Sequence, residues 1–185
     1  MKPLIIFATV LEATDTLKRT NAIAKAEELY SFDKADILIT GMGLEQTERA
    51  VTKHIEHASA LINFGIAGAL RQELAVGSIH NVRHVASEDF EKIGIQKDGL
   101  RLLSVIAPLF DPKARYLNSY HFDLVDMEGY AIAKVAQMHG KPCFLYKIIS
   151  DHCTSDGSCL IKERLPMLSQ RLAQALAEIF LTNDH

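Results

Sequence analysis

The chain has 185 residues, which fits a single domain over residues 1–185, and its 48% hydrophobic and 23% charged residues are typical of a globular protein rather than a disordered one. Its 20 basic and 23 acidic residues give a formal net charge of −3. No lysine- or arginine-rich run stands out, which argues against a nucleic-acid-binding protein.

The first half of the chain alternates short apolar runs with polar or amphipathic stretches. We predict, in chain order, a strand over 4–10, a strand over 35–40 that ends in Gly41-Met42-Gly43, a helix over 45–57, a buried strand over 60–64 that runs into the turn Gly65-Ile66-Ala67-Gly68, and a strand over 78–85.

The second half begins with a stretch, 88–123, that gives no clear pattern of elements. A helix is predicted over 126–139, because Gly140-Lys141-Pro142 is a strong stop signal. A last core strand follows over 143–150, and a closing helix over 160–181 has Pro166 near its first turns.

This order of elements predicts an α/β fold with a mostly parallel central sheet flanked by helices. In such sheets ligands bind beyond the carboxyl ends of the strands. The polar and glycine-containing segments fall at those ends: Glu12, Gly41 to Gly43, Gly65 to Gly68, and Asp151. We therefore expect them to meet at one edge of the sheet.

Three acidic side chains are candidates for chemistry, and each also has a plain structural explanation. Asp151 follows a buried strand, where partial desolvation suits a general acid, but from position alone a helix cap or a turn is the better explanation. Glu128 sits with Asp126 near a predicted helix start, where negative charge is favoured anyway. The plain structural explanation of Glu12 is an exposed glutamate in a loop.

The sequence gives little support for a dinucleotide-binding site or a metal site. The Gly41-x-Gly43 pair lacks the third glycine of a dinucleotide fingerprint. His54 with His57, and His152-Cys153 with Cys159, do not match a structural-zinc spacing, so no metal site is expected.

The compartment is predicted from the cysteines and from the hydropathy of the chain. Three cysteines, an odd number, occur without a recognisable secretory signal, and no apolar stretch approaches the ~20 residues of a membrane span. We expect a soluble cytoplasmic protein with free thiols and no membrane partner.

Several sequence blocks taken together resemble the nucleoside phosphorylase/nucleosidase superfamily. The resemblance is greatest to its hydrolytic branch, the 5′-methylthioadenosine/S-adenosylhomocysteine nucleosidases and the futalosine hydrolases. The matching blocks, in order, are FATVLEAT, ITGMG, INFGIAGAL with VGSI, VDMEGYAIAKVA, and KIISD. The resemblance implies a three-layer phosphorylase-like fold, a small-molecule nucleoside substrate, a homodimer, and no cofactor or metal.

The resemblance also implies residue roles. Asp151 would protonate the purine at N7 as the base leaves, and Ser150 would orient it. Glu12 would activate the attacking water. The remaining substrate contacts would come from Glu128 on the ribose hydroxyls, Met127 against the sugar, the Gly65-Ile66-Ala67-Gly68 segment at the ribose and water site, and Lys147.

Water is the favoured nucleophile. Phosphorylases of this superfamily grip phosphate with arginines, whereas the loop Ala8-Thr9-Val10-Leu11-Glu12 has no cation and carries an anion. The expected reaction is hydrolysis of methylthioadenosine, S-adenosylhomocysteine or aminodeoxyfutalosine, the last in menaquinone synthesis. The alternatives are a purine nucleoside phosphorylase and a nucleoside-binding protein with little turnover.

The chain departs from the family pattern at three places. Ile66 replaces a small polar residue, which is more typical of futalosine hydrolases. Lys147 stands where an arginine is usual, so the charge is kept but the planar fork is lost. The stretch 88–123 is short. In the family this region supplies the aromatic residue that stacks on the base, and the candidates within it are Phe90, Phe110, Tyr116 and Tyr120.

Overall fold

The computed structural model describes residues 1–89, 91–109, 122–154 and 157–181. Its strands are β1 (Lys2–Phe7), β2 (Ile23–Ala24), β3 (Leu29–Ser31), β4 (Asp36–Ile39), β5 (Ala58–Ala69), β6 (Ile79–Ala86), β7 (Lys92–Gly94), β8 (Leu100–Ser104), β9 (Leu124–Asp126) and β10 (Cys143–Asp151). Its helices are α1 (Val10–Thr20), α2 (Leu44–His54) with a 3₁₀ turn (Ile55–His57), α3 (Gly129–Met138), and α4 (Gly157–Leu176) with a final π turn (Ala177–Leu181).

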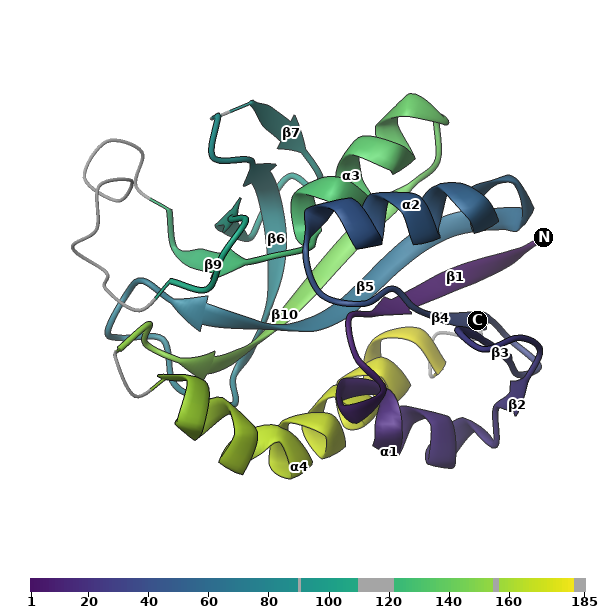
Figure 1. The fold of residues 1–185 in the computed structure, drawn as a ribbon, viewed down its shortest axis with the longest axis horizontal. Helices are drawn as coiled ribbons and strands as arrows, with labels where there is room; N and C mark the ends of the chain where they lie inside the picture. The colour runs from purple at the N-terminus through teal and green to yellow at the C-terminus, as the bar shows by residue number, and fades with distance from the viewer. Residues whose placement is uncertain (90, 110–121, 155–156, 182–185) are drawn as a thin grey trace.

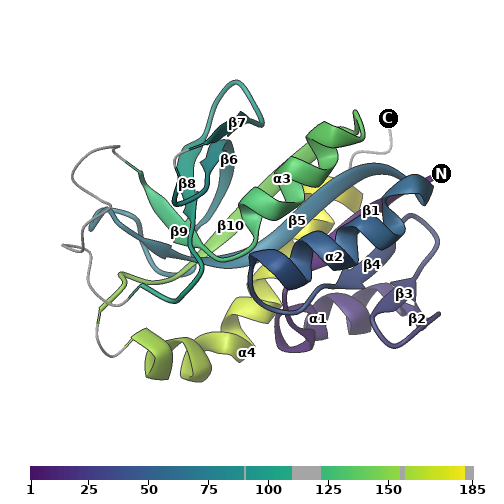
Figure 2. The ribbon, with the colours of Figure 1, turned by 45° about the horizontal axis from the view of Figure 1, so that its top comes forward.

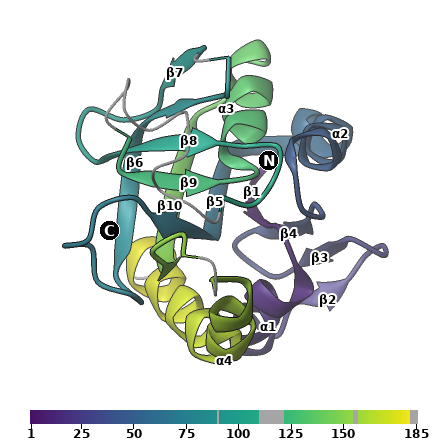
Figure 3. The ribbon, with the colours of Figure 1, turned by 60° about the vertical axis from the view of Figure 1, so that its left-hand side comes forward.

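The strands form one mixed sheet in the order β10-β6-β8-β9-β5-β1-β4-β3-β2, with β7 paired to β6 (Figure 1). A further pairing between β10 and β5 closes β5, β10, β6, β8 and β9 into a small barrel, seen from its side of the molecule in Figure 3. Among the described strands, as many neighbouring pairs are antiparallel as parallel. The expected α/β class is confirmed, but the prediction of a mostly parallel sheet is wrong. The prediction was based on continuous apolar runs, which show that a strand is buried but not in which direction it runs.

The long strand β5 joins the barrel to the rest of the sheet. Its residues 61–63 pair with β1, and its residues 61–68 pair with β10, both in parallel. Its last residues, Gly68 and Ala69, pair with β9 in the opposite direction. The last residues of β5 therefore lie between β9 and the carboxyl end of β10, whereas β1 ends beside the middle of β5.

Helices cover both faces of the sheet, with α1 and α4 together on one side and α2 and α3 together on the other (Figures 1 and 2). Under α1 and α4 the core contains Ile5, Phe7 and Phe64, together with Leu172 of α4. Alternate residues of the same strands, such as Leu4 and Ile6, face α2 and α3. Strand side chains alternate between the two faces, so each strand contributes to both core layers.

The predicted turn at Gly65 to Gly68 is wrong, because β5 continues through it. These residues pair one for one with Lys147, Ile148, Ile149 and Asp151 of β10, with a register shift just before Asp151. Neither glycine has a positive φ. Gly68 is needed for space, since a Cβ there would lie 2.5 Å from the Sγ of Cys153.

One helix, α1, was not predicted, and another, α3, begins later than predicted. The first strand ends at Phe7 instead of residue 10, and helix α1 begins at Val10 with Thr9 as its N-cap. The predicted helix over 126–139 begins only at Gly129, since Asp126 belongs to β9. The Asp126 carboxylate accepts a 2.8 Å hydrogen bond from the Gly129 N–H and so fixes the start of α3.

The closing helix starts earlier than predicted, at Gly157, and Pro166 lies in its middle rather than near its first turns. The uninterpreted stretch 88–123 contributes β7 and β8 where it is described. None of the helices in the described ranges combines the length and the apolarity that crossing a membrane requires.

Candidate active site

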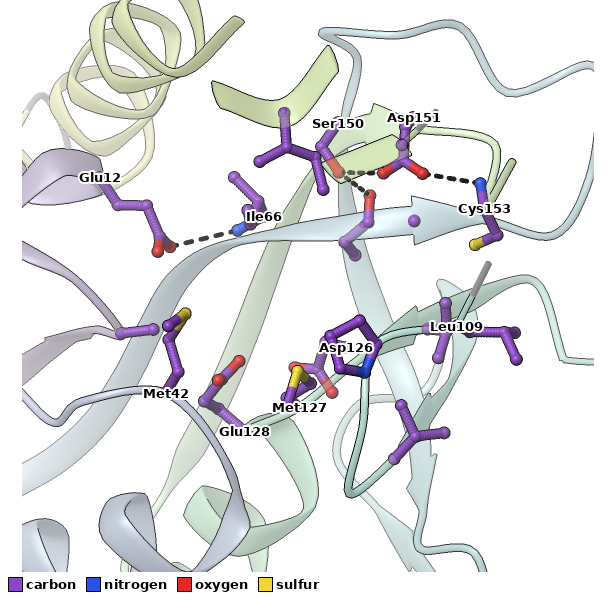
Figure 4. Close-up of a pocket in the computed structure, with 18 residues that line it drawn as sticks. Glu12, Met42, Ile66, Leu109, Asp126, Met127, Glu128, Ser150, Asp151 and Cys153 are labelled. Atoms are coloured by element: carbon purple, nitrogen blue, oxygen red, sulfur yellow. Dashed lines mark hydrogen bonds between the residues drawn. The ribbon is translucent and has the colours of Figure 1, made fainter. Parts of the chain in front are cut away.

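A cavity of about 200 Å³ opens where the carboxyl ends of β5, β9 and β10 meet the start of α1 (Figure 4). Its polar lining consists of four carboxyl groups and one hydroxyl, from Glu12, Asp126, Glu128, Ser150 and Asp151. In Figure 4, Glu12 and Glu128 lie toward one end of the cavity, and Ser150 and Asp151 lie toward the other. The expected meeting of acidic residues at one sheet edge is therefore observed.

Glu12 lies in the first turn of α1 and is buried. Its carboxylate accepts a hydrogen bond from the Thr9 hydroxyl at 2.9 Å and one from the Ile66 N–H at 3.4 Å. Burial raises the pKa of Glu12, although the bonds from Thr9 and Ile66 and the charge of Lys147 act in the opposite direction. A carboxylate with a raised pKa is a stronger base, which suits proton abstraction from water.

Glu128 is the residue that precedes α3, and its side chain turns into the cavity instead of capping the helix. One of its oxygens accepts a 2.8 Å hydrogen bond from the Gly43 N–H. Burial, followed by the negative charge of Asp126, raises the pKa of Glu128 from 4.5 to about 7. The group therefore exchanges its proton close to neutral pH.

Asp151 ends β10, and both of its oxygens accept hydrogen bonds. The Ser150 hydroxyl donates to Oδ1 at 2.6 Å, and the Cys153 N–H donates to Oδ2 at 2.7 Å. The Ser150 hydroxyl also lies 3.2 Å from the carbonyl oxygen of Ala67, and its single proton can go to only one of the two acceptors. Ser150 can thus donate to a charged Asp151, or accept from a protonated one while donating to Ala67.

Behind the cavity, Asp126 forms an ion pair with Lys147, whose Nζ lies 2.7 Å from Oδ2. Both side chains are only 1% exposed. Asp126 also accepts a 2.5 Å hydrogen bond from the Ser104 hydroxyl. Lys147 does not line the cavity, so its predicted contact with substrate finds no direct counterpart in the lining.

Gly65 is likewise outside the lining and instead leaves space for Lys147. A Cβ on Gly65 would come 3.1 Å from Lys147 Nζ and 3.4 Å from Asn63 Nδ2. The other members of this segment, Ile66, Ala67 and Gly68, do line the cavity, as does Met127.

The remaining wall is apolar and was not recognised in the sequence. It includes Met42, Val105, Leu109, Val125 and Ile161. These residues come from separate loops and elements and carry no local signal that would single them out. By contrast, a signal for α1 was present and overlooked, because Thr9-x-x-Glu12 has the spacing of a capping box.

Cys153 also lines the cavity and adopts a left-handed backbone conformation, with φ of 55°. Burial, and then the neighbouring Asp151 charge, raises the pKa of the Cys153 thiol to about 12. The thiol is thus neutral and unsuited to be a nucleophile, whereas its backbone N–H holds Asp151. No Lys, Arg, His or aromatic residue occurs among the described residues that line the cavity.

The four aromatic residues predicted as candidates for stacking on the base, Phe90, Phe110, Tyr116 and Tyr120, lie outside the described residues. No group of three or more His, Cys, Asp or Glu side chains suited to a metal ion occurs within the described ranges.

Comparison with known proteins gives a family and a set of similar structures. A family model of the phosphorylase superfamily matches residues 80–181, which is more than half of the chain. No curated protein sequence matches the chain. The structure is similar to that of the MTAN of Chlamydia trachomatis, with 27% identity over 98% of each chain and a TM-score of 0.86. The D-to-N variant of that protein bound to MTA gives a TM-score of 0.84.

Two further similarities concern the fold alone. The 5′-methylthioadenosine/S-adenosylhomocysteine nucleosidase of S. pneumoniae has 19% identity over 95% of this chain and 96% of its own, with a TM-score of 0.84. The MTAN of Helicobacter pylori has 16% identity over 96% and 97%, with a TM-score of 0.81. The resemblance predicted from the sequence blocks is confirmed.

Proposed function

The chain belongs to the phosphorylase superfamily, and we propose that within it the protein is an N-glycosyl hydrolase that releases adenine from a 5′-modified adenine nucleoside. The observation that carries the proposal is the convergence of Glu12, Glu128 and Asp151 on one cavity from three distant parts of the chain. The 27% identical MTAN of Chlamydia trachomatis, whose structures include one bound to adenine, supports it.

The reaction needs a base on one side of the glycosidic bond and an acid on the other. Glu12 takes a proton from water as the water oxygen bonds to C1′ of the ribose. The bond between C1′ and the base breaks ahead of this attack, its electron pair leaves with adenine, and adenine receives a proton at N7 from Asp151. A positioned acid of this kind contributes roughly 10²–10⁴ in rate.

The two ends of the cavity suit these roles. Glu12 is buried and has a raised pKa, as a base near neutral pH requires. At the other end, Ser150 is able to reverse its hydrogen bond when Asp151 gains or loses a proton, because Ala67 offers it a second acceptor. Negative charge beside the sugar also stabilises the oxocarbenium character that develops as the glycosidic bond breaks.

The ribose is held by Glu128 and packs against Met127. Glu128 has one oxygen bonded to the Gly43 N–H and the other available to a sugar hydroxyl. Hydrogen bonds to a charged acceptor are stronger than those to a neutral one. The apolar segment at Ile66 and Ala67 lines the ribose and water site.

Water rather than phosphate is the nucleophile. A phosphate dianion needs cationic partners, and the described lining of the cavity offers carboxyl groups without a lysine or arginine. The ammonium of Lys147 is turned to Asp126 behind the cavity.

The proposed substrates are methylthioadenosine, S-adenosylhomocysteine and aminodeoxyfutalosine. Ile66 favours the last of these through the resemblance to futalosine hydrolases, which would place the protein in menaquinone synthesis. We further propose that the protein acts in the cytoplasm as a homodimer, without cofactor or metal.

The test is adenine release from each of the three nucleosides, measured by chromatography in phosphate-free buffer and again with phosphate added. The expected result is release at the same rate in both, with the free 5′-modified ribose as the second product. Dependence on phosphate, with a ribose 1-phosphate product, would identify a phosphorylase instead. Adenine binding without release from any substrate would identify a nucleoside-binding protein.

A further inference from the structure

A buried cation lies directly behind the acidic cavity. The Lys147 ammonium comes from β10 and forms a 2.7 Å ion pair with Asp126 at the end of β9. Asp126 lines the cavity, whereas Lys147 does not. Lys147 is thus one layer behind the groups that meet substrate.

Neighbouring groups contact both members of this pair. The Ser104 hydroxyl and the Gly129 N–H hold the two oxygens of Asp126. On the other side, Gly65 leaves room for the ammonium, and Asn63 is anchored by a 3.0 Å hydrogen bond from its Nδ2 to the Ile6 carbonyl oxygen. These contacts position the ammonium and the carboxylate so that their charges act on the groups that line the cavity.

The positive charge of Lys147 acts on two carboxyl groups of the cavity. Glu12, from α1, faces the charges of Lys147 and Asp126, and Glu128, from the start of α3, faces Asp126, Lys147 and Glu12. Both glutamates are buried, so ionising both of them beside Asp126 is costly. A positive charge nearby reduces that cost.

We propose that Lys147 is a positioning residue which, through its ion pair with Asp126, sets the protonation of Glu12 and Glu128 without touching the substrate. In this arrangement the charge of Lys147 lowers the cost of negative charge in the cavity for both glutamates. Glu12 is then available in its charged form as the base for water, and Glu128 as the charged acceptor of the ribose hydroxyls. The role of this pair in catalysis rests on the proposed function. The electrostatic coupling between the ion pair and the two glutamates does not, because it can be measured without substrate.

The raised pKa values agree with this arrangement. For both glutamates burial is the largest influence and raises the pKa, and Asp126 raises it as well. Lys147 lowers it in both. The two members of the ion pair thus shift the pKa of the same glutamates in opposite directions, so removing one or the other should have opposite effects.

The test is a carboxyl ¹³C NMR titration of the full-length protein labelled at its glutamate side chains. Signals are assigned with Glu12→Gln and Glu128→Gln. The titration is repeated on Lys147→Met, Asp126→Asn and the double variant. Because interacting groups titrate together, the midpoints are read as properties of the pair of glutamates.

Lys147→Met is expected to raise the midpoints by about one pH unit, and Asp126→Asn to lower them by a similar amount. The double variant is expected to titrate close to the wild type, since the two effects oppose each other. Lys147→Arg, which keeps the charge, is the matched control and should shift them little. Unchanged midpoints, or shifts of the same sign in both single variants, would overturn the proposal.

Lys147→Met leaves a buried carboxylate unpaired and so carries a risk of unfolding. Asp126→Asn then carries the test, because asparagine keeps an oxygen for the Ser104 hydroxyl or the Gly129 N–H. If wild-type protein releases no adenine from any nucleoside, the proposed function fails while the titration still decides the role of Lys147. If adenine is released, the acidic limb of kcat/KM should move in the same directions as the midpoints.

Discussion

The backbone N–H of Gly43 donates a 2.8 Å hydrogen bond to Oε1 of Glu128, and so joins the loop after β4 to the start of α3. Gly43 has φ of 96°, a conformation that favours glycine and that aims its N–H at the carboxylate. With one oxygen held in this way, Glu128 keeps a fixed direction toward the cavity. The contact suits this residue at a helix start to its proposed role of binding the ribose.

Glu128→Gln should therefore weaken sugar recognition more than it affects chemistry. Glutamine retains an oxygen for the Gly43 N–H but presents a neutral amide to the ribose hydroxyls. We expect KM for methylthioadenosine to rise about 10-fold or more, as charge-assisted hydrogen bonds are replaced by weaker ones, with a smaller change in kcat. Steady-state kinetics of adenine release measure both, and unchanged kinetics would remove Glu128 from the substrate site.

The same residue should make stability depend on pH. The folded protein raises the pKa of Glu128 from 4.5 to about 7, so it binds this proton more tightly than the unfolded chain does. The associated stability is present below pH 4.5 and is lost as pH rises toward about 7. We expect the free energy of unfolding, relative to Glu128→Gln, to fall by about 3 kcal/mol over that range. Urea unfolding at several pH values tests this, and parallel curves for the two proteins would contradict it.

Asp151→Asn should abolish most turnover while leaving the fold intact. The asparagine oxygen can accept from the Cys153 N–H, and its amide can donate to Ser150, whose hydroxyl then donates to Ala67. The local hydrogen bonds survive, but the proton for N7 is missing. We expect kcat to fall by at least about 100-fold. Adenine release and thermal unfolding are measured together, and near-normal activity in the folded variant would exclude Asp151 as the acid.

Gly157→Ala should displace the Asp151 carboxyl group. A Cβ on Gly157 would lie 2.9 Å from Oδ2 of Asp151, closer than such contacts allow, so the carboxyl group must move. A misplaced acid is expected to lower kcat on the order of 10- to 100-fold. Because the same crowding also costs stability, thermal unfolding is measured beside adenine release to show that the variant remains folded.

Gly94→Ala is the matched control for Gly157→Ala. Gly94 lies in β7, and a Cβ on it meets nothing within 4 Å. The control should keep full activity. Equal losses of activity in the two variants would show that the effect does not come from crowding Asp151.

Much of the fold was predictable from local patterns. The runs around Ile37, Ile62 and Ile148 are apolar because these strands are buried, and the structure places strands at all three. The stop signal at Gly140 predicted a helix end at residue 139, and α3 ends at Met138. By contrast, Ala8 to Glu12 was interpreted as strand and loop, although the capping-box spacing of Thr9 and Glu12 indicated the helix start that the structure shows.

The family, the α/β class and the two acidic residues Glu12 and Asp151 could be predicted from the sequence, because each prediction depends on residues that are neighbours in the chain. The closure of β5, β10, β6, β8 and β9 into a barrel, and the pairing of Lys147 with Asp126 behind the cavity, became visible in the folded molecule and not before. Strand direction and the partner of a buried charge depend on contacts between segments far apart in the chain. Such contacts are selected by packing and desolvation in the folded molecule, for which a local pattern carries no signal.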